Sequence, residues 1–440
     1  MDKIFCLLSV VLYFFAPMHY SFEYCLVLFI SVVFNAYYIF SKDKKNEIVG
    51  FNSIFSLSLI LVTYIFPLFV YEVFPNYSLF GYAYNEKVIT KSTALVNVAY
   101  SCYAVGYLMV LKNKPRRILN IRNSLYEFPT LVSKSRIPIF RRCVLFLFIV
   151  VVVAGGLTSF KKQYSGEDAG AMGGILSFVW LVFQTFCILF TCVNLKYNDK
   201  KSFLLLALIM FLLLAVGSRT LPLCIVSLIF YAFCLKRKYS LKRILLYVVF
   251  AFIVFSIVGR LRLGPEQDLS GISANELGVL NYFEDFIVCS RNQYVIYDFV
   301  QRKGVTFGIS ALGYVLAVVP FSQSIVCSLF GLSDADLRSE VLTTKWASSD
   351  AGLGTHIVGD VYLAFGLFGV IFLFYLLGYI VAKSRRYMFL GNRKGTIIYL
   401  ILLSGAMFMC RGSYFYSLKN IVWSLIIVSL FGIIKKRRKK

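Results

Sequence analysis

Long apolar segments recur along the chain from one end to the other. A helix of about 17–25 mostly apolar residues is long enough to cross a bilayer. Segments of this kind predict twelve membrane spans, near 4–20, 22–40, 51–71, 93–111, 143–159, 174–194, 203–218, 220–235, 244–259, 364–382, 396–410 and 416–434. Because a helix pairs its backbone polar groups within its own segment, the pattern predicts an all-α polytopic integral membrane protein.

The charged residues predict how these spans are oriented. Only 15% of the 440 residues are charged and 59% are hydrophobic, yet the net charge is +25. This balance excludes a soluble enzyme, a disordered tail protein and an ordinary nucleic-acid binder, so no nucleic-acid partner is expected. Of the 46 Lys+Arg residues, 32 fall in the alternate segments that would then be cytoplasmic, the N-terminus, 41–50, 112–142, 195–202, 236–243, 383–395 and 435–440. The positive-inside rule therefore predicts that both termini are cytoplasmic.

The spans divide the chain into three regions. Residues 1–259 form a predicted transmembrane bundle of about nine spans, and residues 364–440 hold the C-terminal spans and a basic cytoplasmic tail. Between them, 260–363 is one long outward loop with amphipathic helices, which we expect to form a folded lid on the bilayer. A loop of this length is uncommon unless it has a function.

Two features of the sequence suggest other assignments of the spans. Residues 1–20 resemble a cleaved signal peptide, but Lys3 is the only basic residue before the apolar run and no A-x-A site follows it. The apolar stretch 305–332 has the length of another span, but Pro320 lies in its middle. An extra span would also place the basic tail outside the cell. We therefore expect 305–332 to be interfacial or re-entrant.

The sequence contains no pattern that indicates a metal or a cofactor. The 11 cysteines include no CxxC pair and no Cys/His cluster, and no nucleotide-binding glycine motif is present. Cys289 and Cys327 share the outward loop, so a disulfide between them is an open alternative. Asp334 and Asp336 match the DxD of nucleotide-sugar transferases, although an outward loop favours a solvated turn.

Five arginines outside the basic cytoplasmic segments stand out, because four lie at or near the outer ends of predicted spans and one lies in a half-apolar stretch of the long outward loop. Ionisable groups near membrane depth are costly and are candidates for function. Arginine binds phosphate with two parallel hydrogen bonds and stays charged, which suits a pyrophosphate ligand. An interface anchor is the ordinary alternative for each one. The five predicted phosphate-binding residues are Arg219, Arg260, Arg262, Arg291 and Arg411.

A glycine-rich stretch at 352–366 supplies the candidates for proton transfer. His356 and Asp360 are four residues apart, so both are expected on one face of a helix. Histidine is a natural general base near neutral pH, and aspartate can orient it or act in its place. The alternative is that both are polar residues that cap the start of a helix.

These pieces resemble the O-antigen (repeat-unit) polymerase family, often called Wzy. The resemblance covers the layout of the whole chain, with about 11–14 spans, termini inside and one long outward loop before the last spans. At the residue level it lies in Gly217-Ser218-Arg219, in Arg260, in the stretch 352–366 and in Arg411-Gly412-Ser413. A fold similar to that of GT-C glycosyltransferases is what the resemblance implies.

The resemblance also implies a reaction. Oligosaccharide repeat units linked to undecaprenyl pyrophosphate would be polymerised on the outer leaflet of the bacterial inner membrane, at an active site that faces the periplasm. The arginines would hold the pyrophosphate, and His356 or Asp360 would act as base, with Tyr282 and Trp346 available to stack on sugars. The implied partners are the lipid-linked oligosaccharide, membrane lipid and a chain-length regulator of lipopolysaccharide biosynthesis.

Two alternative functions share parts of this pattern. An O-antigen ligase, which transfers the finished chain to lipid A core, also has a long outward loop with arginine and histidine. Ligases usually show a His-Asn run, whereas Ile357 follows His356 here. A lipid-linked oligosaccharide flippase would need charged residues within its spans and usually lacks one dominant outer loop.

Overall fold

The computed structural model describes residues 2–42, 49–75, 85–112, 128–155, 174–236, 242–243, 246, 284–347 and 354–437. Within these ranges the chain is helical and contains no β-strand. The first half of the described chain comprises α1 (Asp2–Phe15), α2 (Phe22–Lys42), α3 (Phe51–Ile65), η1 (Phe66–Val70), η2 (Glu86–Val88), α4 (Ile89–Lys112), η4 (Lys134–Arg136), α5 (Ile137–Val153), α7 (Gly174–Tyr197), α8 (Lys200–Ala215) and α9 (Thr220–Lys236). The second half comprises α12 (Glu284–Lys303), α13 (Ile309–Leu316), α14 (Ser322–Phe330), α15 (Asp334–Leu337), α16 (Ser339–Trp346), α17 (Ile357–Phe389), α18 (Arg393–Cys410) and α19 (Leu418–Arg437).

Several helices are long and apolar enough to cross a membrane. Six candidate spans occur among the described residues, at Phe22–Lys42, Phe51–Val70, Glu86–Lys112, Leu176–Tyr197, Ile357–Phe389 and Arg393–Cys410. Shorter apolar helices lie at Lys3–Phe15, Thr220–Lys236 and Leu418–Phe431. The prediction of an all-α, multi-pass membrane protein is thus confirmed, while the number twelve stays a prediction. The predicted span 244–259 lies outside the described residues, except for Leu246.

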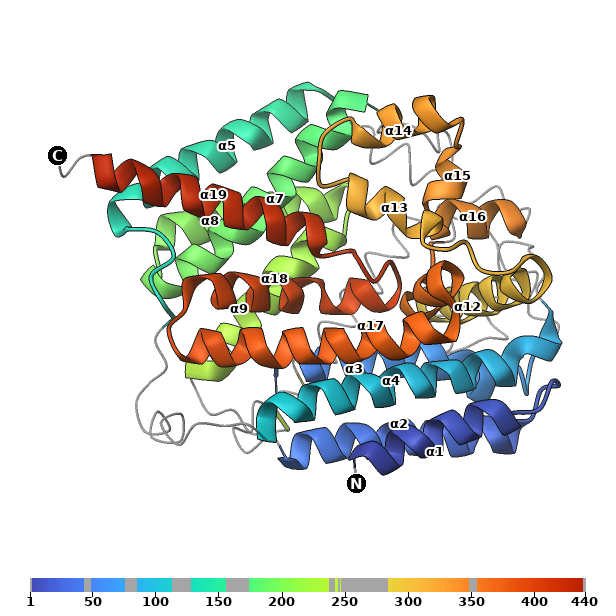
Figure 1. Cartoon of the computed structure of the whole chain (residues 1–440). Helices are drawn as coiled ribbons and strands as arrows, with labels where there is room; N and C mark the ends of the chain where they lie inside the picture. The colour runs from blue at the N-terminus through green and yellow to red at the C-terminus, as the bar shows by residue number, and fades with distance from the viewer. Residues whose placement is uncertain are drawn as a thin grey trace.

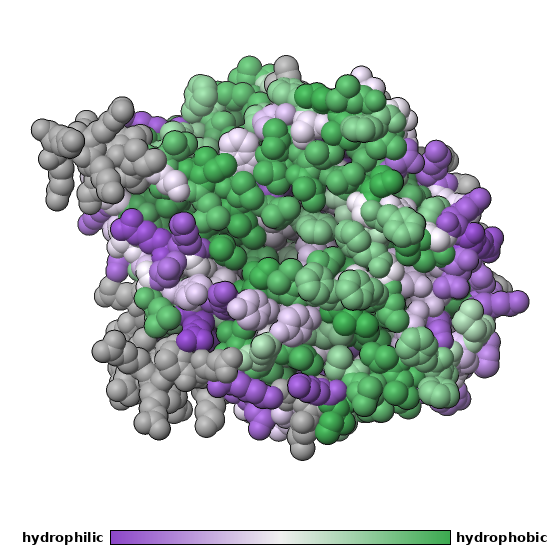
Figure 2. Space-filling model, in the orientation of Figure 1, coloured by the Kyte–Doolittle hydropathy of each residue, from purple (hydrophilic) through white to green (hydrophobic). Residues whose placement is uncertain are grey.

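The helices run roughly side by side, so that their ends gather at two sides of the molecule (Figure 1). Among them, α4, α17 and α19 run toward the side on which the C-terminus lies, and α18 runs back (Figure 1). Figure 2 shows a broad hydrophobic surface over the middle of the helices and hydrophilic residues toward the helix ends. An apolar belt between two polar rims is the surface that a bilayer-spanning bundle requires.

The central contact of the fold is the crossing of α4 and α17, where glycines let the two backbones meet. A Cβ at Gly106 of α4 would lie 2.0 Å from the carbonyl oxygen of Tyr375, and a Cβ at Gly378 of α17 would lie 2.1 Å from that of Tyr103. Small residues of this kind allow close approach in membranes, where packing rather than hydrophobicity drives association. The two glycines therefore fix the position of α17 in the bundle.

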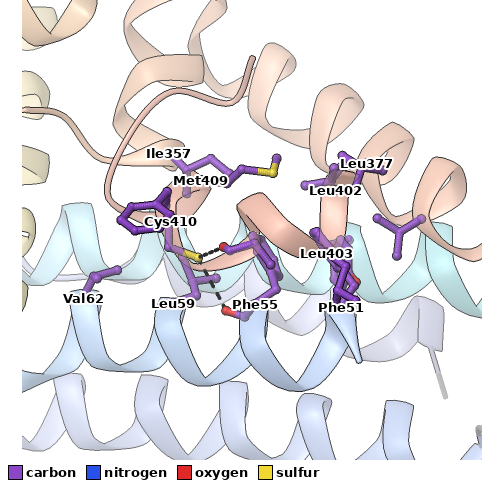
Figure 3. Packing of buried hydrophobic residues seen from close by; sticks show 14 of the residues in the cluster. Phe51, Phe55, Leu59, Val62, Ile357, Leu377, Leu402, Leu403, Met409 and Cys410 are labelled. Carbon is purple, nitrogen blue, oxygen red and sulfur yellow. Dashed lines mark hydrogen bonds between the residues drawn. The ribbon is translucent and has the colours of Figure 1, made fainter. Parts of the chain in front are cut away.

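Helix α18 packs between α3 and α17 (Figure 3). The buried rings of Phe51 and Phe55 stack with their centroids 5.3 Å apart on the face of α3 that meets α18. At the end of α18 the thiol of Cys410 donates to the carbonyl oxygen of Phe55 over 3.5 Å. This packing brings the last turn of α18 close to the middle of α3 and to Ile357 at the start of α17 (Figure 3).

Helix α17 is broken near its start. Gly366 has φ 65° and ψ −161°, a conformation that separates the first two turns from the rest of the helix. The break leaves the carbonyl groups of Leu363 and Ala364 without their usual helical donors. They accept hydrogen bonds instead from the amides of Thr306 and Gly308, at 2.8 Å each. The segment that follows α12 thus holds the first turns of α17 in a direction of their own.

The region predicted as an outward loop is helical over its described part. Helix α12 is buried along most of its length and packs against α3, α17 and α16. Helices α13 and α14 have 8 and 9 residues, too few to cross a bilayer. These helices and the residues just before them expose large apolar side chains, which include Phe307, Phe321, Leu329 and Phe330. Two short helices thus occupy 305–332 in place of a single span, and its interfacial position stays a prediction.

Candidate active site

The start of α17 carries the two residues predicted to transfer protons. His356 precedes the helix with an extended backbone, and its Nδ1 accepts a hydrogen bond from the amide of Val358 at 3.2 Å. The histidine is therefore an N-cap, which supplies an acceptor to one of the free amides of the first turn. Since Nδ1 accepts, the neutral ring carries its proton on Nε2, which lies 3.4 Å from the hydroxyl oxygen of Thr63.

His356 is held in its neutral form by its surroundings. The residue is completely buried. Burial lowers the pKa of His356 from 6.5 to about 3, because the charged imidazolium loses its hydration. A neutral ring whose only lone pair is taken by Val358 can donate from Nε2 but cannot accept a proton without a change of tautomer or contact.

Asp360 lies one turn further along α17 and joins three segments. Its Oδ1 accepts from the hydroxyl of Ser339 on α16 at 2.6 Å. Its Oδ2 accepts from the hydroxyl of Ser413 at 2.8 Å and from the amide of Tyr414 at 3.0 Å. The carboxylate is 1% exposed, so these three donors replace the water that burial removes. Asp360 therefore ties α16 and the corner between α18 and α19 to the start of α17.

Helix α12 completes the site from the side of α3. The hydroxyl of Ser290 donates to the carbonyl oxygen of Val62, which neighbours Thr63. One residue later, the guanidinium of Arg291 is completely buried. Gln293 faces α17, where a Cβ at Gly359 would lie 2.8 Å from its Oε1. Arg291 is thus placed on a helix that contacts both α3 and the turn between His356 and Asp360.

Two buried polar side chains at this site have no hydrogen-bond partner within the described part of the chain. They are the amide of Gln293, at both Oε1 and Nε2, and the hydroxyl of Thr355. Such groups are rare in folded proteins and carry a free-energy penalty unless a water or a ligand pairs with them. They flank Gly359 and His356, and they indicate where hydroxyl groups of a ligand would find partners.

The other predicted arginines lie on different elements. Arg411 directly follows α18 and is half-buried, and its carbonyl oxygen is 3.7 Å from the Cβ position of Gly354, two residues before His356. Arg219 is half-buried between α8 and α9. Helix α9 packs against α18 and α7. Arg260 and Arg262 lie outside the described residues. The structure therefore brings Arg291 and Arg411 to the segments around His356 and Asp360.

Two alternatives from the sequence receive a structural answer. Asp336 of the DxD sequence accepts hydrogen bonds from the amide and hydroxyl of Ser333 at 2.8 and 2.6 Å and caps α15. The described residues contain no group of three potential metal ligands. Cys289 is buried, and it and Cys327 are free thiols. The DxD sequence is thus a helix start, and the disulfide is not formed.

Four residues of the candidate site were given no site role from the sequence. They are Ser339, Ser413, Gln293 and Thr355. Ser339 and Ser413 are 21 and 53 residues from Asp360 in the sequence. The one local signal was the Arg411-Gly412-Ser413 corner, in which the serine rather than the arginine contacts Asp360.

Comparison with known proteins identifies the family. The family model described as "O-antigen polysaccharide polymerase Wzy" matches residues 3–439, almost the whole chain. No curated protein and no solved structure matches the chain. Because the model covers the bundle, the candidate site and the basic tail, the chain belongs to the O-antigen polysaccharide polymerase Wzy family.

Proposed function

We propose that this protein joins oligosaccharide repeat units linked to undecaprenyl pyrophosphate into an O-antigen type polysaccharide. The reaction takes place at the outer leaflet of the bacterial inner membrane, with the site around Asp360 facing the periplasm. Family membership supports the polymerase role. The observation that supports the site assignment is that Asp360 joins the start of α17 to Ser413, two residues after Arg411, while α12, which carries Arg291, packs against α17.

The arginines would act on the leaving group. As the bond between the anomeric carbon and the pyrophosphate oxygen breaks, negative charge builds up on the pyrophosphate. A buried guanidinium placed beforehand stabilises that charge without reorganisation of solvent. Arg291 and Arg411 are the described candidates, and Arg219, Arg260 and Arg262 would extend the same cationic surface. The lipid carrier then leaves as undecaprenyl pyrophosphate.

The base would take the proton of the attacking sugar hydroxyl. The Nδ1 lone pair of His356 is occupied by the amide of Val358. Both oxygens of Asp360 already accept hydrogen bonds, and two of the three donors are serine hydroxyls that can rotate away. We therefore assign the base to Asp360. Its carboxylate accepts a hydrogen bond from the sugar hydroxyl in place of that from Ser339 or Ser413, and then takes the proton. His356 then positions the first turn of α17.

Gln293 and Thr355 would recognise the sugars. Their buried, unpartnered polar atoms suit the many hydroxyl groups of an oligosaccharide. A ligand that lacks those hydroxyls would leave the same atoms unpaired. The proposed partners are thus the lipid-linked repeat units, together with a chain-length regulator that sets the number of units joined.

The test is the length of the surface polysaccharide in a host strain that lacks the gene. The deletion strain should carry single repeat units on lipid A core, and the wild-type gene should restore a ladder. A strain without any units on the core would indicate a ligase instead, and units trapped on the cytoplasmic side would indicate a flippase. Either result would contradict the proposal.

Variants of the arginines test the site separately. Arg291→Lys and Arg411→Lys keep the charge but lose the paired geometry of the guanidinium, so each should shorten the ladder at normal protein level. Arg393→Lys is the matched control, because Arg393 is exposed at the opposite end of α18. Full ladders with both site variants would show that these arginines do not hold the pyrophosphate.

A further inference from the structure

The opposite end of the bundle contains a cavity of about 510 Å³. It lies among the end of α2, the start of α3, the last turns of α4 and α17 and the first turns of α18. Gly50 and Arg385 line it, and they belong to 41–50 and 383–395, two of the basic segments that the sequence predicts to be cytoplasmic. The cavity is therefore separate from the site around Asp360 and has the size of an ordinary ligand pocket.

One part of the cavity wall is cationic and polar. Arg385 of α17 lines it and is 5% exposed. Its Nη1 donates to the hydroxyl of Tyr107, and its guanidinium carbon lies 5.7 Å from the ring centre of Phe389. These two contacts orient the guanidinium on the wall. A buried, oriented arginine is the side chain that binds phosphate most specifically.

The start of α3 adds donors to the same wall. Gly50, Phe51, Asn52 and Ser53 line the cavity, and they form the N-cap and the first turn of α3. Gly50 supplies no side-chain cap. In this first turn the amide of Phe51 donates to the hydroxyl of Tyr399 over 3.3 Å, and the helix dipole places partial positive charge at this end of α3. The helix start and Arg385 therefore favour the same kind of ligand, an anion.

Apart from Ser56 and Tyr399, the rest of the wall is apolar. Ala36 and Phe40 of α2, Leu57 and Ile60 of α3 and Val381 of α17 line it. Leu57 is 48% exposed, so this side of the cavity reaches the hydrophobic surface of the bundle. A pocket with a cationic end and an apolar side matches an amphiphile with an anionic head. A free phosphate ion would leave the apolar wall without a partner.

We propose that this cavity binds the phosphate head of an anionic phospholipid from the cytoplasmic leaflet. The phosphate accepts hydrogen bonds from Arg385 and from the start of α3, and the acyl chains lie against α2 and α3 beside Leu57. Basic pockets between membrane helices on the cytoplasmic side recognise such heads. A bound lipid would join the ends of α2, α3 and α17 and would stabilise the folded bundle.

The experiment uses the full-length protein, purified and stripped of lipid in detergent. Native mass spectrometry and the apparent Tm are measured with phosphatidylglycerol, with phosphatidylcholine and with inorganic phosphate alone. We expect a retained phosphatidylglycerol adduct and a higher Tm, with about tenfold weaker binding of phosphatidylcholine, which carries no net charge. Equal binding of the two lipids would overturn the proposal. A shift with inorganic phosphate alone would assign the site to a soluble anion.

Two variants with a matched control test the location. Arg385→Met should weaken phosphatidylglycerol binding about ten- to a hundredfold through loss of a charge-assisted hydrogen bond. Leu57→Trp fills the apolar side from a half-exposed position and tests the cavity even if Arg385→Met fails to fold. Arg393→Met removes an exposed arginine at the same end and should bind as the wild type. Unchanged binding in Leu57→Trp, or a loss in Arg393→Met equal to that in Arg385→Met, would contradict the proposal.

Discussion

Each end of α17 buries one charged side chain, Asp360 at the first end and Arg385 at the second, and the groups around these two side chains differ. At the first end three protein donors surround the carboxylate of Asp360. At the second end the guanidinium of Arg385 lines a cavity. The carboxylate has protein donors that offset its burial until a substrate hydroxyl replaces a serine, whereas the guanidinium on the cavity wall leaves space for a ligand beside it. Burial of a charge alone therefore does not identify a ligand site, because the groups around the charged side chain decide its role.

Removal of the Asp360 carboxylate should have the largest effect on stability. Asp360→Leu leaves the Tyr414 amide and the Ser339 and Ser413 hydroxyls to find new acceptors. We expect a loss of about 3–5 kcal/mol, measured as a fall in the apparent Tm of the purified protein.

Asp360→Asn is the informative companion, because an amide can accept from Tyr414 and donate to a serine hydroxyl. The Asp360→Asn protein should fold but should not join repeat units into polymer, since an amide is not a base at neutral pH. An Asp360→Asn protein that gives a full ladder would reduce Asp360 to a positioning residue.

The crossing of α4 and α17, which lies between the two ends of α17, should be the next most sensitive to substitution. Gly378→Ala places a Cβ 2.1 Å from the carbonyl oxygen of Tyr103, and neither backbone can yield without moving a helix. We expect a loss of about 3 kcal/mol, seen in the apparent Tm. Gly391→Ala is a control for strain alone, since Gly391 has φ 78° and no neighbour within 4 Å of its Cβ position. An equal loss in both variants would argue against close packing as the cause.

A fall in pH should lower the stability of the folded protein through His356, at the start of α17. Its pKa is about 3 in the folded chain and about 6.5 when unfolded, so between these values the unfolded chain binds more protons. Stability should therefore be intact above pH 6.5 and fall as the pH falls below it, by about 2 kcal/mol at pH 5. The apparent Tm of wild type and His356→Gln, measured from pH 5 to 8, gives this difference. Parallel pH profiles for the two proteins would show that His356 titrates normally.

The membrane class of the fold followed from local patterns, but the buried position of α12 did not. Apolar runs mark α2, α3, α4 and α18 because each must meet lipid or other apolar helices. Helix α12 contains Arg291, Asn292, Gln293 and other polar residues, so its composition resembles that of an exposed helix. It is buried through contacts with α3 and α17 that only the tertiary structure reveals.

The site was predicted in part. The spacing of His356 and Asp360 placed both at the start of one helix, and this is where they lie. The prediction of a shared helical face missed that His356 is the N-cap, although capping was the stated alternative. The partners Ser339 and Ser413 come from distant parts of the chain, and no local pattern could identify them. The cavity beside Arg385 likewise arises from five helices, so no single segment indicated it.

Turnover by the purified protein tests the central claim most directly. Lipid-linked repeat units, extracted from the deletion strain, are incubated with wild type, Arg291→Lys or Arg393→Lys, and polymer length is measured together with released undecaprenyl pyrophosphate. Wild type and Arg393→Lys should give a ladder with one carrier released per bond formed, and Arg291→Lys should give neither product at a comparable rate. A wild-type protein that forms no polymer, or an Arg291→Lys protein that matches it, would contradict the account.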